Sequence, residues 1–66
     1  MNTAAHTTAD MISDYLFYLV QSRRAEQEKN YSLRNWSDMQ MNDLYKAIAA
    51  AGHGEELTKA LKAMFR

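Results

Sequence analysis

The sequence predicts a small all-α protein, and three observations lead to that class. Proline is absent and glycine occurs only as Gly52 and Gly54. Ala, Leu, Met, Lys, Glu and Gln, which favour helices, are plentiful. Apolar residues between Asp10 and Val20 recur at helical spacing. We therefore expect a single small helical domain over residues 1–66, with one long N-terminal helix packed on a C-terminal two-helix hairpin and dimerised through the long helix.

The long helix is expected over residues 8–30, after a disordered tail at residues 1–7. The tail carries no periodic apolar pattern. A helix start follows it, because a hydroxyl of the Thr7-Thr8 pair can accept a free backbone N–H of the first turn. Asp10 would face the positive end of the helix dipole. No helix-breaking residue follows before about Asn30.

Residues 31–40 are expected to form a turn or a short helix, and residues 41–66 a helical hairpin. Ser37 and Gln40 have the spacing of a capping box, in which two side chains satisfy each other's free backbone N–H groups. The next helix is therefore expected to begin between residues 38 and 42. It would stop at Gly52, where a left-handed residue ends a helix at low cost, and the last helix would run over residues 55–65.

The apolar surface of the first helix is too wide for one neighbour. Ile12, Leu16 and Leu19 form an ordinary core stripe, and the flanking aromatics widen the apolar arc to roughly 200°, about twice what one packed face requires. The hairpin cannot cover all of it, so a homodimer is expected. The positions that continue the stripe are polar, beginning at Arg23. This second half of the helix would lie in solvent or meet a partner through charge.

Phe17 is the residue that periodicity separates most clearly from the core. It falls on the polar side of the first helix, and Arg24 shares its face at i+7. Aromatic residues and arginine are enriched in protein interfaces. Phe17 could equally pack under the mid-chain segment near Trp36, which would itself be either a lid on the core or an exposed anchor. The residues expected at a dimer or partner interface are Tyr15, Phe17, Tyr18, Leu19, Arg23 and Arg24.

Neither catalysis nor a cofactor or metal is expected. The absence of cysteine removes disulfides, thiolate zinc sites and cysteine nucleophiles. His6 and His53 each lack a second ligand at suitable spacing, and Asp10 and Asp14 at i and i+4 are explained by the helix dipole. No glycine-rich phosphate loop or nucleophile turn is present. The chain is therefore expected to act without enzymatic activity.

A nucleic-acid partner is the alternative. The stretch "SLRNWSDMQMNDLYKAIAAAG" resembles the helix-turn-helix of small antitoxin-like repressors, with Leu44 to Ala47 on the recognition helix. The resemblance implies a dimeric transcriptional regulator. Its nucleic-acid contacts would come from the basic residues Lys46, Lys59, Lys62 and Arg66.

The charge balance disfavours a nucleic-acid partner. Eight basic and eight acidic side chains cancel, so nothing in the net charge attracts the chain to DNA or to anionic lipid.

The longest apolar run is too short to cross a bilayer, and no signal peptide is recognisable, so a cytoplasmic location is expected. We expect a homodimeric protein-protein interaction or regulatory protein, and size and composition suggest a phage or mobile-element type by analogy.

Overall fold

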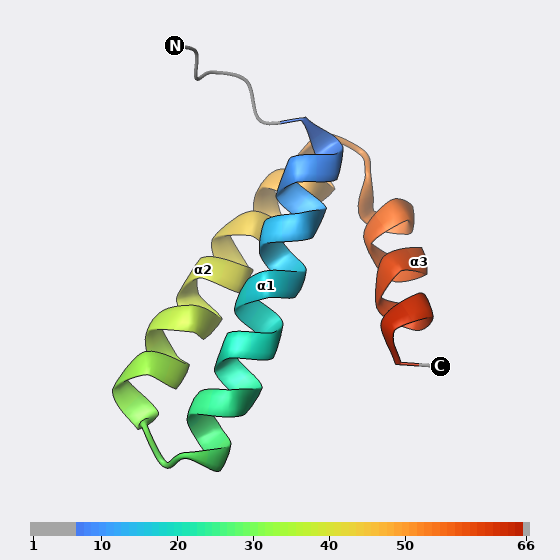
Figure 1. Ribbon diagram of the computed structural model, residues 1–66. Helices are drawn as coiled ribbons and strands as arrows, with labels where there is room; N and C mark the ends of the chain where they lie inside the picture. Colours follow the sequence, from blue (N-terminus) through green and yellow to red (C-terminus); the bar gives the residue numbers. More distant parts are fainter. Residues whose placement is uncertain (1–6, 66) are drawn as a thin grey trace, which may run out of the picture.

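The computed structural model describes residues 7–65, and this part of the chain forms three helices (Figure 1). They are α1 (Thr8–Gln27), α2 (Tyr31–Ala50) and α3 (Gly54–Met64). The predicted all-α class is confirmed. Residues 1–6 of the expected tail lie outside the described residues, as does Arg66.

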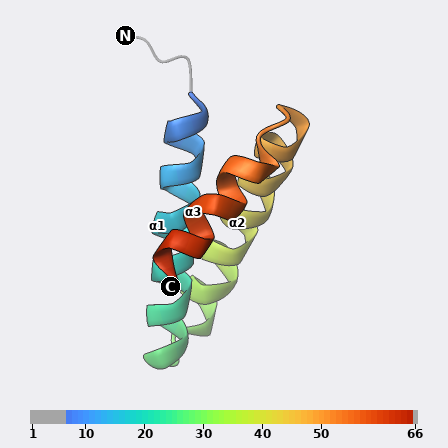
Figure 2. The ribbon, with the colours of Figure 1, turned by 90° about the vertical axis from the view of Figure 1, so that its right-hand side faces the viewer.

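The expected packing of one long helix against a hairpin at residues 41–66 is wrong. The hairpin is formed by α1 and α2, which lie antiparallel along most of their length, and α3 crosses one face of it (Figures 1 and 2). The described part of the chain is about two helix layers thick, with a shortest extent of 19 Å. We call the side of the α1–α2 hairpin that α3 does not cover the open face.

The second helix begins well before the predicted position. Asn30 is its N-cap, with a side-chain oxygen that accepts the backbone N–H of Leu33 at 3.3 Å. Ser37 lies in the middle of α2 and is buried, so it does not cap a helix. Residues 31–40 are therefore part of a 20-residue helix instead of a turn or a separate short helix. This extra length allows α2 to pair with α1.

The two connections between helices share one hydrogen-bonding pattern. After α1, Lys29 N–H bonds to the carbonyl of Glu26 at 3.0 Å, and Asn30 N–H bonds to that of Ala25 at 2.8 Å. After α2, Gly52 and His53 repeat these bonds at 3.0 Å. Both ends are thus Schellman motifs, which place one residue in the left-handed region. That residue is Lys29 (φ 61°) in the first connection and Gly52 (φ 81°) in the second.

The buried core of residues 7–65 is small and partly polar. Its apolar members are Ala25, Ile48 and Leu57, and its polar members are Ser22 and Ser37. Ser22 and Ala25 lie one turn apart on α1, where small side chains allow α2 to approach closely. The second half of α1 therefore packs against this chain's own α2 through small residues. Within the described residues, no helix is both long and apolar enough to cross a membrane.

A candidate protein-binding surface

Three aromatic side chains from both long helices lie in a row on the hairpin. The rings of Phe17 and Tyr18 meet edge to face with centroids 5.3 Å apart, and Tyr18 meets Trp36 in the same way at 5.5 Å. Phe17 and Tyr18 come from α1 and Trp36 from α2. Edge-to-face contacts of this kind have a preferred geometry and contribute stabilisation in addition to the burial of apolar area. We call these three residues the aromatic cluster.

The cluster is exposed in spite of its size. Phe17 is 60% exposed and Trp36 is 48% exposed, whereas Tyr18 between them is half-buried. Trp36 is therefore not a lid buried on the core, which was one of its two expected roles. Among residues 7–65, no loop covers Phe17, because the segment expected to do so is part of α2. The rings stabilise one another while two of them keep a large apolar surface in solvent.

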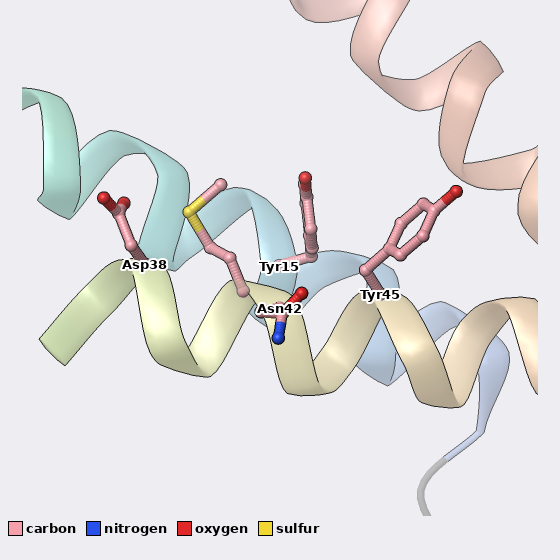
Figure 3. A pocket seen from close by; sticks show the side chains of 5 residues that line it. Tyr15, Asp38, Asn42 and Tyr45 are labelled. Atoms are coloured by element: carbon pink, nitrogen blue, oxygen red, sulfur yellow. The ribbon is translucent and has the colours of Figure 1, made fainter. Parts of the chain in front are cut away.

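Helical geometry places the cluster on the open face. The α3 side of α1 is marked by Arg23, whose guanidinium lies over the Phe65 ring at 4.8 Å from its centroid. Phe17 lies about 120° around α1 from that position. On α2, Tyr45 points toward the side where α3 lies (Figure 3). Trp36, nine residues earlier, lies about 180° around the helix from it.

Two shallow hollows flank the aromatic cluster. One has a volume of about 340 Å³ and lies toward the α1–α2 connection. Its walls are formed by Phe17, Val20, Gln21, Arg24, Glu28 and Leu33. The other has a volume of about 320 Å³ and lies toward the beginning of α1 and the end of α2; its walls include Tyr18, Met11 and Leu44. The first hollow unites Phe17 with Arg24, as the i+7 spacing predicts.

Two partly buried hydrogen bonds between α1 and α2 fix the position of the cluster. Gln21 Nε2 donates to Ser37 Oγ at 2.9 Å, and Ser22 Oγ donates to Asp38 Oδ1 at 2.6 Å. These bonds set the register of the two helices and therefore bring Tyr18 level with Trp36. The sequence pattern predicts a helix cap at Ser37 and no contact at Ser22, so neither hydrogen bond was predicted. The available signal was the small pair Ser22 and Ala25 one turn apart in a helix of larger residues.

The other residues predicted for the interface lie elsewhere. Arg23 contacts Phe65 on the α3 side, and Tyr15 lines a third hollow, of about 250 Å³, together with Met41 and Tyr45 (Figure 3). Leu19 is half-buried one turn from both Tyr15 and Arg23. The structure therefore divides the six predicted residues: Phe17, Tyr18 and Arg24 belong to the open face, and the other three to the side of α1 near α3.

The segment that resembles a helix-turn-helix has no turn between its two expected helices. Residues 32–50 lie in one uninterrupted helix, so Leu44 to Ala47 do not form a separate recognition helix. Asp38 lies in the middle of α2, where it accepts a hydrogen bond from the hydroxyl of Ser22, so the turn that the resemblance implies is not formed there. Lys46 lies on α2 and Lys59 and Lys62 on α3, all exposed, whereas Arg66 is outside the described residues.

Three of the four residues considered as metal ligands lie in the described part of the chain. Asp10 and Asp14 are exposed in the first half of α1. His53, the N-cap of α3, lies with Nδ1 3.0 Å from Glu56 Oε2. This hydrogen bond from His53 is the main cause that lowers the pKa of Glu56 below its usual value. His6 lies outside the described residues, and residues 7–65 contain no group of three or more His, Cys, Asp or Glu side chains that could hold a metal ion.

The chemistry offered by this surface is apolar contact bordered by charge. Its centre is the aromatic cluster, and Asp14, Arg24 and Glu28 stand in the walls of the flanking hollows. An aromatic centre with a polar rim is the composition typical of protein-binding surfaces. Comparisons with protein-family models, with curated proteins and with solved structures find no match to this chain.

Proposed function

We propose that this chain is a non-enzymatic protein-protein interaction protein that acts as a homodimer, with the aromatic cluster at the centre of its contact surface. The single observation that carries the proposal is the row of Phe17, Tyr18 and Trp36 across both long helices. Large aromatics dominate binding energy where a partner excludes water from them. A row of such rings left in solvent on one face supports a contact site at that place.

The thin core supports the same proposal. Only three apolar side chains are buried among residues 7–65, while Phe17, Trp36 and six other large apolar side chains are exposed. A chain of this size tends to gain only about 3 to 5 kcal/mol from its own core unless something reinforces it. A second chain on the open face would provide that reinforcement by removing apolar surface from water.

The dimensions of the molecule are compatible with such a contact. A stable interface buries roughly 800 Å² on each partner. That is about one sixth of the 4840 Å² of accessible surface on this chain. The open face extends over two helices of 20 residues each, which are about 30 Å long. It is therefore large enough for a contact of standard size.

The proposal is tested by comparing Trp36→Ala with Tyr45→Ala. Both residues are aromatic, both lie on α2, and they are similarly exposed, at 48% and 52%, but they lie on opposite sides of the helix. Molar mass by light scattering should show a dimer for the wild type and for Tyr45→Ala, and a shift to monomer for Trp36→Ala. Equal masses for the two variants, with unchanged helix content, would contradict the proposed surface.

A further inference from the structure

The open face of α1 carries a regular seam of residues. Asp10, Asp14, Phe17, Gln21, Arg24 and Glu28 follow one another at alternating spacings of four and three. This is the spacing of the two contact positions in a heptad, and it keeps side chains on one line along a helix. Five of these side chains are exposed, and Gln21 is half-buried because it reaches Ser37. We call this line the outer seam.

The charges along the outer seam are unevenly distributed. Asp10 and Asp14 lie before Phe17, and Arg24 lies after it. Neither of the ion pairs found among residues 7–65, Arg34 with Glu26 and His53 with Glu56, uses any of these three side chains. The formal net charge of the chain is zero, so two copies have no overall repulsion to overcome. The outer seam therefore offers local charges of both signs to a partner.

We propose that the occupant of the open face is a second copy of this chain, bound with its α1 antiparallel to the first. The inference rests on the proposed function and adds the orientation and register of the dimer. A two-fold axis that crosses the outer seam at the level of residue 19, midway between Asp14 and Arg24, sets Asp14 of each copy opposite Arg24 of the other. A parallel pair would instead set Asp14 against Asp14 and Arg24 against Arg24, which is repulsive at both positions.

The same register places an aromatic side chain in a hollow. Phe17 of the second copy falls opposite Gln21, in the hollow of about 340 Å³ that has Val20 and Leu33 in its walls. By symmetry, Phe17 of the first copy enters the equivalent hollow of the second. Asp10 and Glu28 meet at the two ends of the seam as a like-charged pair. Both are exposed there, so solvent and salt screen their repulsion.

A charge-reversal series tests this arrangement. In the antiparallel dimer, Asp14→Lys and Arg24→Glu each change two attractive pairs into two repulsive ones. Each is expected to weaken dimerisation about tenfold at low salt. The double variant restores opposite charges and should dimerise within about threefold of the wild type. Arg23→Glu, one residue away but on the α3 side, is the matched control and should leave the dimer constant unchanged.

Sedimentation equilibrium gives the dissociation constants, and far-UV circular dichroism confirms that each variant is folded. Weakening by both single variants with rescue in the double variant supports the antiparallel register. The register would be overturned if the double variant dimerised no more tightly than the single variants, or if the single variants dimerised as tightly as the wild type. In either case a wild-type dimer would still support the proposed function. A wild type that is monomeric at every concentration would overturn the proposed function itself, together with the register.

Discussion

Replacing Ser37 tests how closely α1 and α2 approach. Its side chain has no exposed surface and its Oγ accepts the Gln21 amide at 2.9 Å. Ser37→Ala removes this hydrogen bond but adds no volume, and the half-buried Gln21 can still reach water. The expected cost is about 1 kcal/mol. Ser37→Leu removes the same bond and also forces three further carbon atoms between the helices, which adds about 1 to 3 kcal/mol of overpacking.

The total for Ser37→Leu, about 2 to 4 kcal/mol, is comparable with the about 3 to 5 kcal/mol that a core of this size supplies. Urea unfolding followed by circular dichroism at 222 nm measures it, at one fixed chain concentration because dimerisation would shift the midpoint. Ser32→Leu, on the exposed surface of the same helix, is the control and should cost little. If Ser37→Leu costs no more than Ser37→Ala, the helices are not closely packed at this position.

Three further predictions concern the turns and α3. Lys29→Gly should stabilise the chain and Gly52→Ala should destabilise it, each by about 1 kcal/mol in urea unfolding, because both positions have positive φ. A Cβ at Gly52 would meet no other atom, so the cost there comes from the backbone conformation alone. Effects of the same sign for the two substitutions would contradict this. Leu57→Ala, at a 2% exposed position on α3, should cost about 2 to 5 kcal/mol and increase hydrogen exchange in α3 before the other helices. An equal increase in all three helices would show that Leu57 does not hold α3 on the hairpin independently of the pairing of α1 with α2. The hydrogen bond from His53 is the main cause that lowers the folded pKa of Glu56. The ionised carboxylate therefore contributes to the stability of the fold above the usual pKa of 4.5, and this contribution is lost as pH falls through the folded pKa. An NMR titration should therefore show the start of α3 loosening in acid, and Glu56→Gln should remove that dependence; an identical titration in the variant would count against the bond.

Local signals in the sequence predict local structure well in this chain. Thr7 caps α1, and its Oγ1 accepts the Asp10 N–H at 3.1 Å, close to the predicted helix start. Gly52 ends α2 in the left-handed region, where the sequence predicts the stop. Each of these features depends on hydrogen bonds within about five residues, so neighbouring residues are sufficient to specify it.

The packing of the helices could not be predicted in the same way, because it depends on contacts between distant residues. Ser37 and Gln40 fit the local pattern of a capping box, but Ser37 is held in mid-helix by Gln21, sixteen residues away. The polar second half of α1 gives no apolar stripe, since its contact with α2 uses Ser22 and Ala25. Periodicity places Phe17 on the polar side of the first helix but leaves open whether another segment covers it, and its alignment with Trp36 required the hairpin.

The central claim, that the aromatic cluster is the contact surface, is tested most directly by the fluorescence of Trp36, the single tryptophan of the chain. In the monomer this side chain is about half exposed, and in the proposed dimer it is removed from water. Its emission should shift to shorter wavelength as concentration rises, with a midpoint equal to the dissociation constant from sedimentation. An emission maximum that stays constant while the molar mass doubles would show that the chain dimerises through another face and would contradict the claim.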